Sequence, residues 1–230
     1  MAGTMENTDF SEYLQETEML GFSHPAVQEY VAEFRALPTK KQQAAGIYLK
    51  VRDGFLYDPY HLDLRKEALT ASAIIGNRRA WCVEKSIVCC ASMRALGIPA
   101  RLGFGIVKNH IGVEKLVKYL QKDEIVFHGF TEVFLDGRWT KCTPAFDRRI
   151  CRLSGVEPLE WSGEADSLFQ AYRGEERYME YLHFYGVFPD VPLQLMHSEM
   201  QQHYPHLFEE PVDTPEFSFR FDADLTGISS

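Results

Sequence analysis

Hydrophobic positions in the first hundred residues recur every three or four residues, which is the spacing of an α-helix. One helix is predicted to begin at Pro25 and to end before Pro38, because proline suits a helix start and disrupts a helix interior. A second helix is predicted to follow Thr39, where Gln42 completes a capping-box pattern, and to end at Gly54.

A third helix is predicted over residues 82–96, which contain neither glycine nor proline. Gly97 and Pro99 follow it, and a glycine directly after a helix is a common stop signal. Cys82 therefore lies in the first turn of this helix. The segment before it, residues 55–64, is expected to be a loop with one helical turn.

Beyond residue 100 the pattern changes to that of β-strands. Residues 100–107 are predicted to form one strand. Two more strands flank Asp136 and Gly137, a pair that favours a tight hairpin turn because both positions take positive φ angles. This turn pairs Leu135 with Arg138.

The same register, extended along the hairpin, puts Phe130 opposite Thr143 and His128 opposite Ala145. Side chains alternate between the faces of a strand, so these four side chains are expected to share one face. Helices followed by an antiparallel sheet predict the α+β fold class.

The last third of the chain is rich in aromatic residues and shows one further helix pattern, between Pro192 and Pro205. No internal repeat or linker divides the sequence. We therefore expect a single domain over residues 1–230. It would consist of N-terminal helices at 8–37, a core at about 40–147 and a C-terminal extension at 148–230.

The formal net charge is −9, and the sequence contains no long run of lysine or arginine residues. This charge argues against nucleic acid and against an anionic membrane surface as partners. The N-terminal segment is acidic and carries no apolar signal-peptide core, and no apolar stretch is long enough for a membrane span. We expect a cytoplasmic protein with reduced cysteines.

Three of the five cysteines lie close together, at Cys82, Cys89 and Cys90. Their spacing does not fit the ligand pairs of a zinc site, and the chain has no C-x-x-C redox motif. We therefore expect neither metal nor cofactor. Cys89 and Cys90 are interpreted as packing residues within the helix.

Cys82 differs from the other cysteines because it stands at a helix start. Unpaired backbone N–H groups and the helix dipole stabilise a thiolate there, and the same N–H groups can bind an oxyanion. His128, on the following hairpin, is a candidate imidazole partner. Taken singly, Cys82 could equally be packed under Trp81, and His128 could be structural.

Two motifs strengthen the catalytic interpretation. The first is Cys82-x-Glu84, with Gly97 fifteen residues after the cysteine, and the second is HGFTEVFLDGRW, which begins at His128. Together they resemble the nucleophile helix and the histidine hairpin of the transglutaminase-like superfamily, which has a papain-like fold. The resemblance covers roughly residues 45–147, and the segment at 150–206 resembles the extension of bacterial transglutaminase-like domain proteins.

The resemblance implies a Cys-His-Asp site, with Cys82 as the nucleophile and His128 as the general base and acid. It departs from the family pattern at the third position, where Thr143 stands in place of the usual aspartate. A threonine hydroxyl can orient the imidazole but carries no charge. Asp147, four residues further on, is the alternative source of a carboxylate.

Three aromatic residues complete the candidate site. Trp81 could form a wall of the acyl pocket, and Tyr57 or Tyr60 could donate a hydroxyl to the oxyanion; simple packing explains all three equally well.

The leading hypothesis is a cysteine-dependent acyl hydrolase or acyltransferase that acts on a peptide or other amide bond. The alternatives are a degenerate member that serves as a binding or scaffold module, and an unrelated α+β protein with a core cysteine and a core histidine. The sequence does not indicate an oligomeric state.

Overall fold

The computed structural model describes residues 10–109, 114–168, 172–173, 176–177 and 179–222. Its α-helices and 3-10 helices are α1 Ser11–Leu14, α2 Pro25–Val31, η1 Ala32–Ala36, α3 Lys40–Gly54, α4 Ala71–Ile75, α5 Cys82–Ala95, α6 Glu114–Leu120, α7 Arg148–Ser154, α8 Leu193–His203 and η2 Pro205–Leu207. Its strands are β1 Leu56–Tyr57, β2 His61–Asp63, β3 Arg79–Ala80, β4 Ala100–Asn109, β5 Glu124–Leu135, β6 Arg138–Cys142, β7 Tyr172–Arg173, β8 Glu176–Arg177, β9 Met179–Phe188, β10 Val212–Asp213 and β11 Ser218–Arg220.

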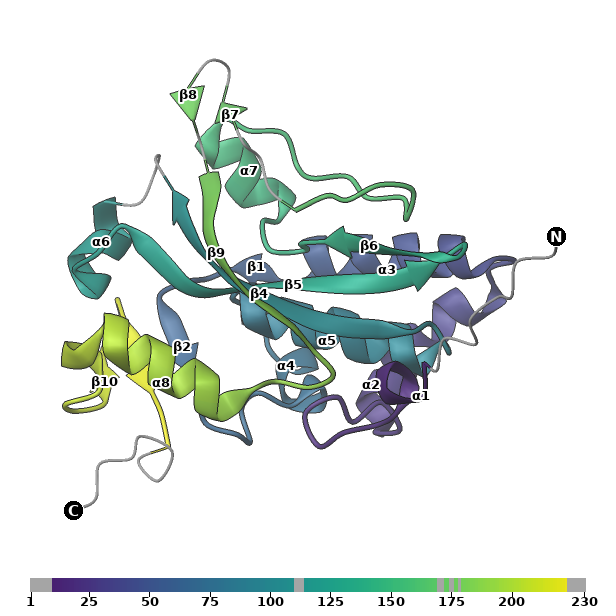
Figure 1. Cartoon of the computed structure of the whole chain (residues 1–230), viewed down its shortest axis with the longest axis horizontal. Helices are drawn as coiled ribbons and strands as arrows, with labels where there is room; N and C mark the ends of the chain where they lie inside the picture. Colours follow the sequence, from purple (N-terminus) through teal and green to yellow (C-terminus); the bar gives the residue numbers. More distant parts are fainter. Residues whose placement is uncertain (1–9, 110–113, 169–171, 174–175, 178, 223–230) are drawn as a thin grey trace, which may run out of the picture.

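A twisted antiparallel sheet with the strand order β6-β5-β4-β9 crosses the middle of the molecule (Figure 1). The hairpin between β5 and β6 has the predicted register, with Leu135 opposite Arg138. Both turn residues, Asp136 and Gly137, take positive φ angles of 50° and 82°. The α+β fold class is therefore confirmed, and the turn forms for the expected reason.

The hairpin register does not extend as far as predicted. β6 ends at Cys142, opposite Thr131. Beyond it, the Thr143 N–H donates to the carbonyl of Ser167 at 3.0 Å, so it bonds to a different segment. The predicted pairs of Phe130 with Thr143 and of His128 with Ala145 consequently do not form. Beyond the end of β6, the segment around Ser167 replaces β5 as the hydrogen-bonding partner.

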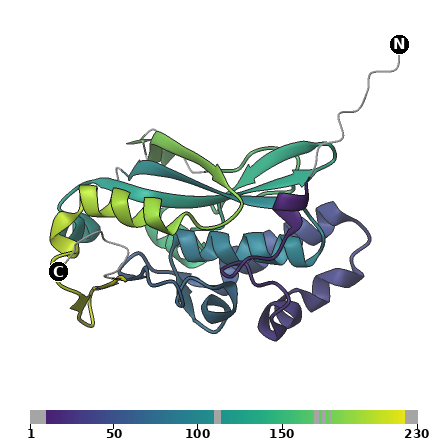
Figure 2. The same cartoon turned by 60° about the horizontal axis from the view of Figure 1, so that its bottom comes forward.

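Helix α5 lies against one face of this sheet, and α2, α3 and α4 lie on the same side (Figure 2). The close approach of α5 to β5 depends on small and polar residues. A Cβ at Gly129 would lie 3.0 Å from the Cα of Val83, and the Thr131 hydroxyl donates to the carbonyl of Ser86 at 3.3 Å. The first turn of α5 is thereby fixed against the middle of β5.

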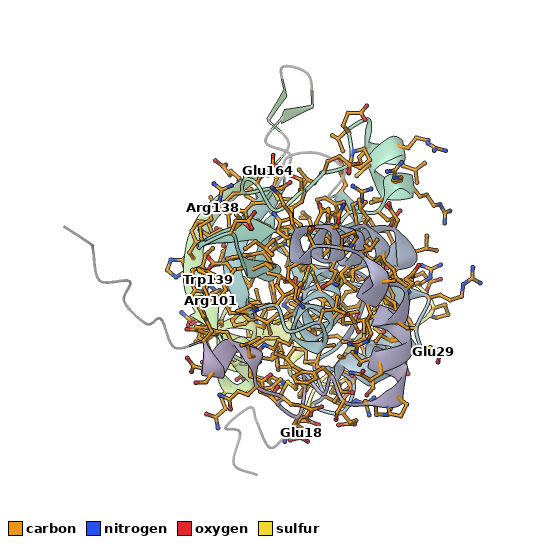
Figure 3. The ribbon with its side chains drawn as sticks, turned by 90° about the vertical axis from the view of Figure 1, so that its right-hand side faces the viewer. Glu18, Glu29, Arg101, Arg138, Trp139 and Glu164 are labelled. Atoms are coloured by element: carbon orange, nitrogen blue, oxygen red, sulfur yellow. The ribbon has the colours of Figure 1, made fainter. Side chains whose placement is uncertain are left out.

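The opposite face of the sheet carries paired aromatic and charged side chains. Glu132 accepts from Arg101 at 2.7 Å. Figure 3 shows Arg101 beside Trp139, and its guanidinium carbon lies 4.1 Å from the Trp139 ring centroid. This arrangement joins the neighbouring strands β4, β5 and β6 through their outward-facing side chains.

One prediction about local structure was wrong. The segment 55–64 contains the short strands β1 and β2 instead of a loop with a helical turn. The aromatic segment after residue 170, for which the sequence pattern predicts no element, contains β9, an edge strand of the central sheet. Pairing with β3, β11 and β4 stabilises these segments, and such long-range partners leave no local sequence signal.

The C-terminal extension is built into the fold. In addition to β9, it supplies β11, which pairs in parallel with β2 so that Phe219 lies opposite Leu62. Its helix α8 contacts β5. No helix in the described ranges is long and apolar enough to cross a membrane.

Candidate active site

Helix α5 begins at Cys82, as the sequence predicts. Trp81 is the N-cap residue, and its N–H donates to the Glu84 carboxylate at 3.0 Å. This bond satisfies a backbone donor at the helix start and fixes the backbone next to the cysteine.

Three backbone N–H groups face the Cys82 sulfur, those of Gly129, Val83 and Cys82 itself, and each favours the thiolate. Burial acts in the opposite direction, because the residue is only 1% exposed. The net result is a thiol pKa raised to about 11. The expectation of a lowered pKa was therefore wrong, since it considered the helix start and not the depth at which the thiol lies.

Cys82 lines a narrow, mainly apolar pocket of about 20 Å³, which is roughly the space that one water molecule needs. The walls come from α5, α6, β5, α8 and the segment around β1 and β2. The lining residues are Tyr57, Pro59, Leu62, Trp81, Cys82, Leu116, Leu120, Ile125, Val126, Met200 and Tyr204. An acyl group that reaches the sulfur here has to be small or has to displace part of this lining.

His128 lies on β5 opposite Gly105, just after an irregularity in the pairing of β4 with β5. Its neighbour Phe127 has a φ angle of 62°, which is uncommon for a bulky residue. A bulge of this kind interrupts the alternation of side chains along a strand, and this one lies directly before His128.

The His128 ring is 1% exposed and lies edge-on to Tyr181, with 6.0 Å between the ring centroids. Neither ring nitrogen forms a hydrogen bond with any described residue, Cys82 included. Burial lowers its pKa to about 4. In this conformation the imidazole is neutral and has no charged partner in the described part of the chain.

Thr143 is buried directly after β6. Its carbonyl accepts from the Tyr48 hydroxyl at 3.4 Å, and its hydroxyl lies beside that of Tyr181. The Thr143 side chain thus lies beside Tyr181, whose partly buried ring packs next to His128.

Asp147 is the N-cap of α7. Its carboxylate accepts from the backbone N–H of Tyr57 at 2.6 Å, of Arg149 at 2.8 Å and of Ile150 at 3.1 Å. These bonds hold the segment before β2 against the start of α7. In this structure the Asp147 carboxylate binds these backbone N–H groups and does not orient the His128 ring.

Tyr181 on β9 is a residue that the sequence did not single out. Its ring packs against His128, and its hydroxyl lies near Thr143. Its pKa is raised, mainly by burial, and the nearby Cys82 contributes. The sequence signal for it is the aromatic-rich stretch at 181–185, a composition that is typical of a strand.

The three aromatic candidates take different positions. Trp81 and Tyr57 line the Cys82 pocket, and Tyr57 packs edge-on against Phe146 at 4.8 Å. Tyr60 lies apart from that lining in the described residues, with the Lys115 ammonium 4.4 Å from its ring centroid.

All five cysteines are buried, and none of them forms a disulfide. No group of three or more His, Cys, Asp or Glu side chains in the described part of the chain is arranged to hold a metal ion.

Comparison with protein families agrees with this architecture. The model of the transglutaminase-like superfamily matches residues 28–144, just over half of the chain. A solved structure from Cytophaga hutchinsonii, described as a "Putative Cysteine Protease", is similar at 16% identity with a TM-score of 0.43. The match covers 60% of this chain and 42% of that one. A comparison with curated proteins gave no match.

Proposed function

Because the chain belongs to the transglutaminase-like superfamily, we propose that it is a cysteine-dependent acyl hydrolase or acyltransferase that cleaves an amide bond of a peptide or related substrate. One observation carries this proposal. The Cys82 sulfur lines a pocket at the first turn of α5, and the N–H groups of Val83 and Gly129 are directed at it.

In the proposed reaction, His128 takes the proton from the Cys82 thiol, and the thiolate attacks the carbonyl carbon of the substrate. A C–S bond forms, and the carbonyl electrons move to oxygen. The backbone N–H groups at the helix start stabilise that oxyanion. Its collapse breaks the C–N bond, and His128 returns the proton to the departing amine. Water or an acceptor amine then attacks the thioester and regenerates the thiol.

In the proposed reaction a third residue orients the His128 ring. Thr143 is the proposed orienting residue, because its hydroxyl lies beside Tyr181, which packs on the His128 ring. Asp147 would have to release three backbone N–H groups before it could take this role. The proposed reaction requires no metal or cofactor, and five cysteines without a disulfide fit the reducing conditions of the cytoplasm.

Turnover of a panel of amide and ester substrates by the wild type, Cys82→Ala and Cys90→Ala tests the proposal. Cys90 is a matched control because it is equally buried, on the same helix. We expect Cys82→Ala to lose turnover and Cys90→Ala to retain it. Equal turnover by wild type and Cys82→Ala would exclude Cys82 as the nucleophile.

One observation favours a second function, that of a binding module without catalysis. His128 has no hydrogen-bond partner among the described residues, and no carboxylate faces it. This candidate predicts that a ligand binds equally well to wild type and to Cys82→Ala, and that neither protein turns over any member of the panel.

A further inference from the structure

A larger cleft adjoins the Cys82 pocket. Its volume is about 740 Å³, and Leu62 lines both cavities. Its walls come from β1, β2, β3, β11 and the starts of α5 and α7. The cleft is thus formed where the C-terminal strand β11 pairs with β2, next to the proposed nucleophile.

Arginine side chains are prominent in this cleft, although the chain as a whole is acidic. Two of them have acidic partners: Arg79 lies 3.1 Å from Asp58, and Arg220 pairs with acidic side chains of β2 and β10. The other two, Arg78 and Arg149, are exposed and form no ion pair within the described ranges. The cleft therefore offers two cations that have no counter-ion among the described residues.

The acidic residues of the cleft do not supply that counter-ion. Asp58 is 3% exposed and already bonds to His61 at 2.9 Å as well as to Arg79. Glu84 is 7% exposed and accepts from the Trp81 N–H. Burial, together with the nearby Asp63 and Asp58, raises the Glu84 pKa to about 8. At neutral pH a protonated Glu84 can donate a hydrogen bond to an anion.

We propose that this cleft binds a carboxylate-bearing segment of the peptide substrate, with Arg78 and Arg149 as its ligands. The inference rests on the proposed function, because it makes the cleft the subsite next to Cys82. Guanidinium groups bind carboxylates through paired charge-assisted hydrogen bonds. A monoanion is favoured over a phosphate dianion because Asp58 and Asp63 also line the cleft and repel the greater charge more strongly.

Calorimetric titration of the full chain carrying Cys82→Ala tests this proposal, because that variant binds substrate without acyl transfer. The probes are acetyl-alanyl-glutamyl-alanyl amide, which carries one carboxylate, and its glutaminyl counterpart. We expect the glutamyl peptide to bind about tenfold more tightly than the glutaminyl one, and less tightly as salt is added. Arg78→Gln and Arg149→Gln should each weaken it by about fivefold to tenfold.

Arg152→Gln is the matched control. Arg152 is also exposed and lies one turn further along α7, outside the cleft lining, so this variant should bind like the parent. Equal binding of both peptides, or binding unchanged in Arg78→Gln and Arg149→Gln, would overturn the proposal. Displacement of the peptide by inorganic phosphate at lower concentration than by acetate would overturn the carboxylate assignment. Turnover of the wild type is measured separately, so the two proposals can fail independently.

Discussion

At the scale of single residues, burial determines the charge of the two proposed catalytic groups. It raises the Cys82 pKa to about 11 and lowers the His128 pKa to about 4. Both groups are therefore neutral at pH 7 in this conformation. For the proton to move from the Cys82 sulfur to a His128 nitrogen, a bound substrate has to change the surroundings of both groups. The catalytic site is then assembled when the substrate binds.

The buried His128 predicts a pH dependence of stability. Its pKa is about 4 in the fold against an ordinary value of 6.5, so between these values the unfolded chain binds more protons. Stability should be fully present above pH 6.5 and should fall with decreasing pH, by up to about 1.4 kcal/mol per unit.

Urea unfolding between pH 4.5 and 7 measures this effect. His128→Gln should show a shallower slope than the wild type, while His183→Gln, at an exposed position on β9, should keep the wild-type slope. Identical slopes for the wild type and His128→Gln would contradict the account.

Lys85 offers a second test at this scale. It is completely buried, and its ammonium donates to the carbonyls of Arg52, Phe55 and Ala145 at 2.8, 3.0 and 2.8 Å. Lys85→Met keeps the volume but leaves these carbonyls without a donor, which should cost about 3 kcal/mol or more of unfolding free energy. Lys118→Met, on the exposed side of α6, should cost less than about 0.5 kcal/mol. Similar losses in both variants would refute this role of Lys85.

At the scale of elements, strand β4 needs glycine at two positions because neighbouring groups fill the space that a side chain would occupy there. A Cβ at Gly103 would lie 2.1 Å from the Phe130 ring, and one at Gly105 would lie 2.5 Å from the carbonyl of His183. The rings of Phe130 and Tyr181 occupy the space above these glycines and cover the region of His128.

Gly103→Ala should therefore destabilise the protein by about 2 kcal/mol, because the added methyl group has to displace Phe130. The same change in a Phe130→Ala background should cost clearly less, because the ring is then absent. Thermal unfolding of the four proteins in this cycle measures the coupling. A cost that is the same in both backgrounds would show that the ring is not the cause.

The elements also show what the sequence can predict. The start of α5 at Cys82 and the turn at Asp136 follow from local signals, namely stop residues and φ preferences. The N-cap role of Asp147 also has a local signal, because aspartate is a preferred N-cap residue. Tyr181 and the sign of the Cys82 pKa shift depend on which distant segments pack together, and no spacing along the chain contains that information.

At the scale of the whole molecule, the C-terminal extension closes the proposed site. The Tyr204 hydroxyl accepts from the N–H of Val126 at 2.9 Å and donates to the carbonyl of Glu124 at 2.6 Å. Met200 and Tyr204 of this extension line the Cys82 pocket. Helix α8, which lies beside β5 below the sheet, therefore limits access to the sulfur (Figure 2).

Met200→Ala should widen the pocket and raise the rate at which iodoacetamide labels Cys82, as followed by peptide mass spectrometry. Met196→Ala is the control, because Met196 is equally buried on α8 and does not line the pocket. Both variants lose a similar buried volume and about 2 to 5 kcal/mol of stability. Equal labelling rates in the two variants would contradict this role of Met200. Any increase over the wild type would then come from the lower stability of the fold and not from a wider pocket.

The central claim is that Cys82 forms a thioacyl-enzyme, and direct trapping of that intermediate tests it most closely. The protein is incubated with p-nitrophenyl acetate, whose acyl group is small enough for the narrow pocket, then quenched in acid and mapped by mass spectrometry. The account predicts an acetyl group on Cys82 in the wild type and in Cys90→Ala, and none on any cysteine in Cys82→Ala. Acetylation at another cysteine, or at none in the wild type, would contradict it.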